Sequence, residues 1–287
     1  MLSRLLFGLM ACLAPTVPAL AAPALWQVSD EDSSVWLFGS VHMLRADTEW
    51  RSSAFEKVMS KVDKVYFETD IGPEAQMLIT PLTFELGFNR DGTLLSEIVG
   101  PKLTRRVREA AALYNIPMAS LLTMKPWMAA TTLSMGPLMY SGFDAALGVE
   151  SVLLAELPRE RQGFLETAEE QLGFLAGGTT DEQISMLRAT LDTLDVMESD
   201  IDEMVAAWAA GQPEELGAVF AEQMGGYDEG MVELLIDERN HNWVEQIEQM
   251  LAENESALLV VGAAHLAGDV SVVKLLEDRG FSSRRVQ

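Results

Sequence analysis

One short pattern occurs near both ends of this 287-residue chain: an apolar run that ends in glycine, with a histidine three residues later. Residues 35–42 read VWLFGSVH, and residues 257–265 read ALLVVGAAH. Short apolar runs rich in β-branched residues are typical of strands covered on both faces, as in the parallel sheet of an α/β protein. The repeated pattern therefore predicts an α/β fold with a central, mostly parallel sheet.

His42 and His265 end these two segments, and the chain has only three histidines in total. Glycine adopts backbone angles that other residues rarely reach, so Gly39 and Gly262 are predicted to turn the chain sharply where the strands end. Open α/β sheets place ligands at the carboxyl ends of their strands. We therefore expect both histidines at one crevice, although either pattern taken alone also fits a structural histidine beside an ordinary strand-ending glycine.

Two glutamates follow a second pair of similar apolar runs. Glu68 follows the letters VYF, Glu166 follows FL, and a threonine comes after each glutamate. Glutamates in such loops are most often simply solvated. Here, however, both follow predicted strands and should reach the edge of the sheet where the histidines emerge. Two imidazoles and two carboxylates at one edge suit a divalent transition metal, and we predict His42, Glu68 and His265 as its ligands. Glu68 is favoured as the ligand over Glu166, and the opposite assignment, with Glu68 as general base, is left open.

Arg239 lies on the apolar face of a predicted helix over residues 229–252. A charge on such a face is costly unless it is paired. Two interpretations remain open: Arg239 forms a structural ion pair with an acid, or it faces the crevice and stabilises developing negative charge. His241, two positions further on, points away from this face and is predicted to be exposed.

Residues 1–21 combine a positive charge at Arg4, an apolar segment and the small-residue site Ala-Leu-Ala. This pattern predicts a secretory signal peptide that is cleaved between Ala21 and Ala22, and hence a periplasmic or secreted protein. Lipoprotein processing at Cys12 ranks second, because the apolar run before that residue is short for this purpose. Cleavage would remove the only cysteine, which suits an oxidising compartment.

The net charge of −24 argues against binding to nucleic acid or anionic lipid, since both would repel this protein. No later run reaches the roughly 18 apolar residues that span a bilayer, so we predict no stable membrane insertion. The remaining length suits a single domain over residues 22–287. Residues 71–160, between the two glutamates, are predicted to form a helical insertion.

Several short segments resemble the TraB/GumN family, and they follow the family's order over essentially the whole chain after residue 21. They are FGSVH, the F-E-T strand end, Lys125-Pro126-Trp127, Leu165-Glu166-Thr167, Arg239-Asn240-x-x-Trp243 and VGAAHLAG. The resemblance implies an α/β protein related to the Tiki metalloproteases and, more distantly, to erythromycin-esterase-like and ChaN-like folds. Residues 156–162 depart from the alanine- and glycine-rich stretch expected there, which affects a loop and none of the candidate site residues.

In that group of proteins the paired histidines, a glutamate and an arginine are taken as the active site. Tiki proteins are described as dependent on manganese or cobalt. Transferred to this chain, the resemblance implies a site formed by His42, His265, Glu68 and Arg239. Glu166 matches a further acidic position.

Two functions of different class follow. The first is an exported metal-dependent hydrolase that acts on a peptide or small carbonyl substrate with Mn, Co or Zn, Glu166 as general base and Arg239 holding the oxyanion. The second is a periplasmic protein that binds a peptide or a metal without catalysis. The five methionines of residues 118–139 are either core or an adaptable groove for peptides. The oligomeric state is left open.

Overall fold

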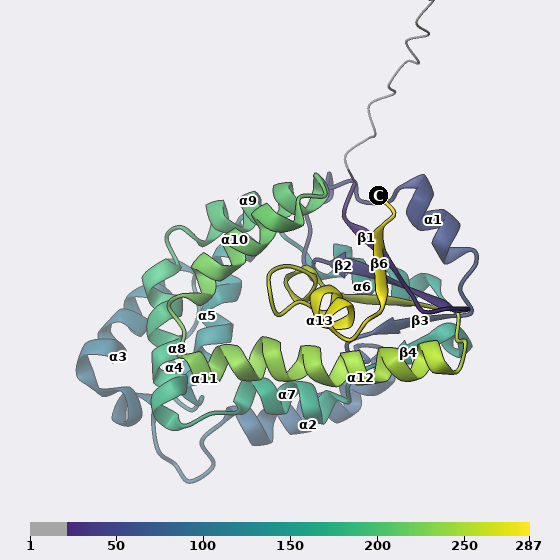
Figure 1. The fold of residues 1–287 in the computed structure, drawn as a ribbon. Helices are drawn as coiled ribbons and strands as arrows, with labels where there is room; N and C mark the ends of the chain where they lie inside the picture. The colour runs from purple at the N-terminus through teal and green to yellow at the C-terminus, as the bar shows by residue number, and fades with distance from the viewer. Residues whose placement is uncertain (1–21) are drawn as a thin grey trace, which may run out of the picture.

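The computed structural model describes residues 22–287, which form a mixed α/β structure around one six-stranded sheet (Figure 1). The predicted signal peptide, residues 1–21, lies outside the described residues. The strands are β1 (Leu25–Ser29), β2 (Ser34–Ser40), β3 (Lys64–Phe67), β4 (Gln162–Phe164), β5 (Ala257–Gly262) and β6 (Ser282–Arg285).

The strand order in the sheet is β4-β3-β5-β2-β1-β6. The first four of these strands are parallel to one another, whereas β1 pairs antiparallel with both β2 and β6. All six residues of β5 are buried, as its continuous apolar run predicts. The predicted α/β fold with a mostly parallel sheet is therefore confirmed.

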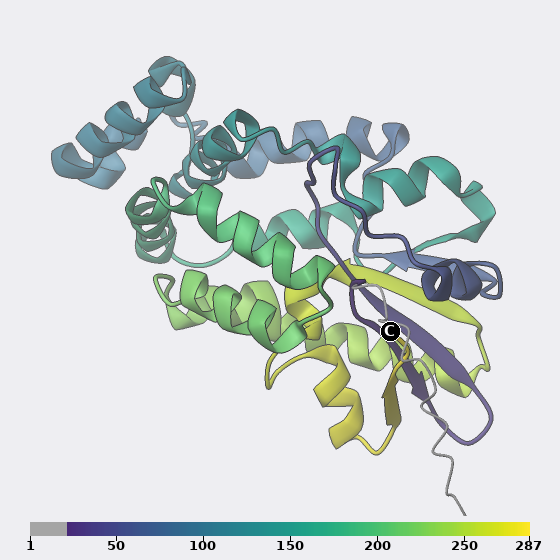
Figure 2. The same ribbon diagram turned by 90° about the horizontal axis from the view of Figure 1, so that it is seen from above.

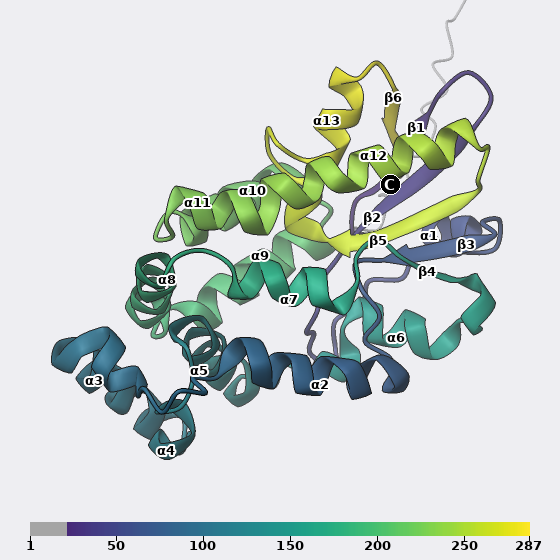
Figure 3. The ribbon, with the colours of Figure 1, turned by 90° about the horizontal axis from the view of Figure 1, so that it is seen from below.

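Helices cover both faces of the sheet. Alternate side chains of β5 point to opposite faces, and apolar residues on both faces must be covered. Leu258 and Val260 pack in one core with residues of α1 (Ser53–Met59), α6 (Val149–Glu156) and α9 (Met197–Ala209). Leu259 and Val261 pack in a second core with α12 (Glu238–Ala252) and α13 (Val272–Asp278). Figure 3 shows α12 running across the sheet.

The chain between β3 and β4 is largely helical, as predicted for residues 71–160. It contains α2 (Pro73–Gly87), α3 (Leu95–Leu113), α4 (Met118–Leu121), α5 (Pro126–Tyr140) and α6. A third core joins α3 and α5 to α8 (Thr180–Thr193), and it includes Met124 as well as Met118 and Met128 at its margin. These methionines therefore fit the core interpretation better than the groove, although Met139 is exposed.

The helices between β4 and β5 include α7 (Ala168–Ala176), α10 (Pro213–Met224) and α11 (Glu229–Val232). Residues 229–252 are helical as predicted, but a π-helical turn, Glu233–Asp237, separates α11 from α12. Figure 2 shows from above that much of the helical part extends away from the sheet. Within residues 22–287, no helix is long and apolar enough to cross a membrane.

Candidate active site

The predicted site residues converge on Gly262, the last residue of β5. A β-carbon at this position would lie 3.1 Å from Glu68 Oε1, 3.5 Å from His265 Cδ2 and 3.6 Å from His42 Nε2. The three predicted metal ligands therefore surround one point. This point lies at the carboxyl edge of the parallel strands, where the sequence places them.

Glu68 and Glu166 are neighbours because the strands that precede them are paired. Strands β3 and β4 are parallel partners, and the backbone N–H of Glu166 donates to the backbone carbonyl of Glu68 at 2.8 Å. Both side chains are buried, with 5% and 7% of each residue exposed. The similar strand ends noted in the sequence thus bring two carboxylates into the protein interior.

Arg239 of α12 lies between these carboxylates and uses all five of its N–H donors. Its Nε donates to Glu166 Oε1 at 2.8 Å, and its Nη2 donates to Glu166 Oε2 at 3.0 Å and to Glu68 Oε2 at 2.5 Å. Its Nη1 donates to His265 Nε2 at 3.3 Å and to the carbonyl of Leu235 at 3.4 Å. Of the two interpretations of Arg239, the ion pair is the one that the structure shows.

Further donors complete the hydrogen bonding of the two carboxylates. The backbone N–H of Gly262 donates to Glu68 Oε1 at 2.7 Å, and Gln171 of α7 donates to Glu68 Oε2 at 3.1 Å. The indole N–H of Trp243 donates to Glu166 Oε1 at 2.8 Å. These hydrogen bonds hold both carboxylates rigidly and favour the charged form of each, against the effect of burial.

The tautomer of His265 follows from its two partners. An arginine can only donate, so Nε2 of His265 must accept the bond from Arg239. The proton is therefore on Nδ1, which lies 2.7 Å from Oδ1 of Asn240. Asn240 in turn donates through its amide nitrogen to the carbonyl of Val270 at 2.7 Å, which fixes the orientation of its side chain.

His42 has a different environment, since 65% of its side chain is exposed. Its Nδ1 lies 2.8 Å from Oε1 of Glu150, a buried residue in the first turn of α6 that also accepts a hydrogen bond from Ser40. The first turn of α6 packs closely on this loop, and a β-carbon at Gly148 would overlap the backbone carbonyl of His42. Glu150 therefore orients the ring of His42 through Nδ1, and Nε2 is not needed to hold the ring in place.

The charges of the site shift four pKa values. Burial alone would raise the pKa of Glu68, but the charge of Arg239 is the main cause that lowers it to about 2, and the backbone N–H of Gly262 acts in the same direction. Burial raises the pKa of Glu166 and lowers that of His265 to about 3. The negative charge of Glu150 is the main cause that raises the pKa of His42, an attraction that solvent weakens because the ring is exposed.

The glycines of the two G-x-x-H segments provide space and not unusual backbone angles, so the prediction of a sharp glycine turn was wrong. Gly262 has φ −48° and ψ 131°, and neither glycine has a positive φ. A β-carbon on Gly39 would lie 3.0 Å from Cα and Cβ of Ala263. The two segments therefore pack directly against each other, and their glycines permit this close approach.

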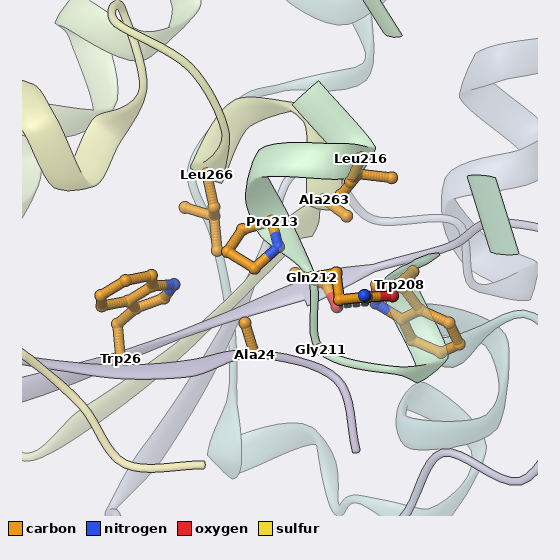
Figure 4. A pocket seen from close by; sticks show the side chains of 10 residues that line it. Ala24, Trp26, Trp208, Gly211, Gln212, Pro213, Leu216, Ala263 and Leu266 are labelled. Atoms are coloured by element: carbon orange, nitrogen blue, oxygen red, sulfur yellow. Dashed lines mark hydrogen bonds between the residues drawn. The ribbon is translucent and has the colours of Figure 1, made fainter. Parts of the chain in front are cut away.

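A small, mainly apolar pocket adjoins these packed segments (Figure 4). Gly39, Ala263 and Leu266 form part of its lining, together with aromatic and proline side chains from other elements. The indole N–H of Trp208 donates to the carbonyl of Gly39 at 2.7 Å. Trp208 therefore holds the backbone of the first G-x-x-H segment beside this pocket.

The arrangement does not fit a metal ion as it stands. Within residues 22–287, no group of three or more His, Cys, Asp and Glu side chains is placed to hold a metal. The guanidinium of Arg239 takes up Nε2 of His265 and oxygens of both Glu68 and Glu166. Metal binding by His42, Glu68 and His265 therefore stays a prediction.

Glu150 and Asn240 were not predicted as site residues. A glutamate in the first turn of a helix is favoured by the helix dipole wherever it occurs, so Glu150 has no distinguishing mark in the sequence. Asn240 is adjacent to Arg239 and belongs to a segment that already resembles a family motif. That adjacency is the one signal that could have identified it.

Fold and site together define a mixed α/β protein with a buried glutamate–arginine–histidine centre at the carboxyl edge of its parallel strands. The chain belongs to the TraB/PrgY/gumN family, whose model matches residues 24–285. It is also similar to an uncharacterized protein of Treponema pallidum (strain Nichols), with 21% identity over 279 residues that cover 88% of this chain and 80% of that protein. No solved structure matches significantly. The family resemblance of the sequence is thus confirmed.

Proposed function

We propose that this protein is an exported hydrolase that cleaves a carbonyl substrate such as a peptide bond, with His42 as the residue that transfers protons. The observation that carries this proposal is the exposed ring of His42, which the buried carboxylate of Glu150 holds through Nδ1. A histidine oriented by a carboxylate and open to solvent is a common arrangement for general acid–base catalysis.

The proposed reaction needs the neutral form of His42, which predominates at pH values above its raised pKa. In that form, Nε2 of His42 takes one proton from a water molecule while the water attacks the substrate carbonyl. The carbonyl carbon gains a C–O bond, and the tetrahedral intermediate then expels the leaving group as the C–N or C–O bond breaks. The imidazolium returns its proton to the leaving atom. Glu150 is a positioning residue here, because it touches His42 and stabilises the imidazolium that forms.

The hydrogen bonds favour different roles for Glu166 and Arg239 from those predicted from the sequence. Glu166 accepts three hydrogen bonds from Arg239 and Trp243, so we assign the base to His42 instead. All five donors of Arg239 have acceptors within the protein, so we assign it no oxyanion. In this proposal both residues form the rigid wall against which the substrate is held.

Two finer points belong to the same proposal. Export rests on the sequence of residues 1–21, and the mass of the purified protein from a periplasmic fraction tests it through the expected start at Ala22. A relation to erythromycin-esterase-like and ChaN-like folds rests on the family resemblance. An experimental structure compared with those folds would test it.

The activity is tested by incubating the purified protein with a diverse peptide library and reading the products by mass spectrometry. We expect cleavage by the wild type, loss of cleavage in His42→Ala, and unchanged cleavage in His241→Ala, whose histidine is exposed on α12. Equal cleavage by the wild type and His42→Ala would contradict the proposal. Peptide binding without any cleavage would favour the alternative, a binding protein.

A further inference from the structure

We infer that the guanidinium of Arg239 is the permanent cation of this centre and occupies the place at which Glu68, Glu166 and His265 would otherwise hold a divalent metal ion. Arg239 lines the proposed hydrolase site, so the inference rests on the proposed function. It is tested by metal binding, however, and not by turnover.

The first support is that one group satisfies all three potential ligands. Nη2 of Arg239 contacts Oε2 of Glu68 at 2.5 Å and Oε2 of Glu166 at 3.0 Å, and the neighbouring Nη1 contacts Nε2 of His265 at 3.3 Å. Two carboxylates and one imidazole form a donor set that suits Mn, Co or Zn. In this protein the donor atoms face the two terminal nitrogens of an arginine.

The second support is the state of His265. A metal binds the lone pair of a neutral imidazole nitrogen. The proton of His265 is on Nδ1, where it is shared with Asn240, so Nε2 carries the lone pair and directs it at the guanidinium. A carboxylate, backbone carbonyl or water behind a histidine is the usual partner of a metal ligand, and the amide oxygen of Asn240 takes that place here. The histidine is therefore oriented as a ligand would be, with Arg239 in the position of the metal.

The third support is electrostatic. Two buried glutamates need positive charge, because unpaired buried carboxylates are strongly disfavoured. Arg239 supplies one charge, and the N–H groups of Gly262, Gln171 and Trp243 supply further donors. A divalent cation at the same place would be repelled by the guanidinium at a few ångströms in a medium of low dielectric constant. Either cation can fill the site, but not both together.

The fourth support is that the arginine is held in place from its own helix. Its Nη1 donates to the carbonyl of Leu235, within the π-helical turn that precedes α12. Its guanidinium carbon lies 4.8 Å from the ring centre of Trp243 on the next turn of the same helix. Single π-helical turns are frequent at functional sites. Arg239 is thus fixed by contacts that do not depend on the carboxylates.

The inference is tested by removing the guanidinium and offering a metal in its place. We expect Arg239→Ala to bind one Mn²⁺, Co²⁺ or Zn²⁺ ion through the freed carboxylates and His265, as measured by isothermal titration. The Tm of the variant should rise by roughly 5–10 °C when the ion is present at about a hundred times its Kd. The Tm of the wild type should not change with the same ions.

Two control variants locate the acquired site. Arg279→Ala removes an arginine from a more exposed ion pair with Glu248 and should acquire no metal. The double variant Arg239→Ala/Glu68→Gln should lose most of the binding that Arg239→Ala gains. Persistence of the acquired binding in the double variant would overturn the inference, because the ion would then lie elsewhere.

The wild type provides a further test, which does not depend on the folding of Arg239→Ala. Protein purified without chelator or metal-affinity resin should contain no stoichiometric divalent metal by elemental analysis. One tightly held ion that is lost in His265→Gln would overturn the inference, and so would a folded Arg239→Ala that binds no metal. If the wild type holds such an ion and still cleaves peptides, the inference fails and the proposed hydrolase stands. If Arg239→Ala gains a metal but the wild type cleaves no peptide, the inference stands and the proposed hydrolase fails.

Discussion

His42 and His265 share one sequence pattern but have opposite environments. His42 follows β2, has an exposed ring and contacts a single buried acid, Glu150. His265 follows β5, is 5% exposed and is hydrogen-bonded at both ring nitrogens. The repeated pattern thus determines where each histidine leaves the sheet, whereas the helices packed against each segment determine its chemistry.

We infer from this contrast that the two histidines have separate roles. The surroundings of His265 form a closed network in which Arg239 joins two acids and an imidazole, as expected of a group that holds the site together. The surroundings of His42 leave one ring nitrogen free to act on a molecule from solvent. We therefore expect changes near His265 to act on stability and changes at His42 to act on chemistry.

The largest expected effect on stability is that of Arg239→Met. Removing one partner of a buried ion pair leaves uncompensated charge, so the free energy of unfolding should fall by about 3–5 kcal/mol in urea titrations. The matched variant Arg279→Met, which breaks a more exposed pair, should lose at most about 1 kcal/mol. Similar losses in both variants would show that the network around His265 contributes no more to stability than the more exposed ion pair does.

Matched glutamine substitutions at the two histidines should have unequal effects. In His265→Gln, the glutamine amide must make the hydrogen bonds to Asn240 and Arg239 with a different geometry. The free energy of unfolding should fall by about 1–3 kcal/mol. His42→Gln can still donate to Glu150 and should change stability by about 0.5 kcal/mol or less, in line with other exposed positions. Denaturant titrations of both variants would measure the difference. A larger loss for His42→Gln would reverse the assignment of tasks.

Stability should also depend on mildly acidic pH. Burial lowers the pKa of His265 to about 3, so below its ordinary value of 6.5 the unfolded chain binds a proton there that the folded chain does not. This group therefore destabilises the fold as pH decreases from 6.5 towards 3, by at most about 1.4 kcal/mol per pH unit. His42 adds little in this range, because its pKa is raised and it is protonated in both states.

The measurement for this effect is the free energy of unfolding at pH 7, 6 and 5. The slope should be smaller in His265→Gln than in the wild type, and His241→Gln, a change at an exposed position, is the matched control. An unchanged slope in His265→Gln would mean that other groups cause the acid sensitivity.

The strands and the positions of the two glutamates were predictable from the sequence. Burial on both faces imposes a continuous apolar run on β5, and in β3 every second residue is buried. Glu68 directly follows β3, and parallel pairing of β3 with β4 then brings Glu166 beside it. The convergence of these acids with His42 and His265 follows from strand geometry alone. The prediction that His241 is exposed is also confirmed.

The interactions inside the site were not predictable in the same way. Helical periodicity places Arg239 on a buried face but does not indicate what lies opposite, so its bonds to both acids could not be derived. Glu150 reaches His42 only through the packing of α6 on a distant loop. The role of Gly39 and Gly262 was mistaken because the sequence does not distinguish a glycine needed for space from one needed for a positive φ.

The central claim, that His265 is a neutral structural group and His42 the reactive one, is tested most directly by NMR of the imidazole nitrogens. With three histidines in the chain, glutamine variants assign every ring. From pH 10 to 5, His265 should stay neutral with its proton on Nδ1, and His42 should titrate above the ordinary value of 6.5. The pKa of His42 should fall in Glu150→Gln. A His265 that titrates in this range, or a His42 unaffected by Glu150→Gln, would contradict the account.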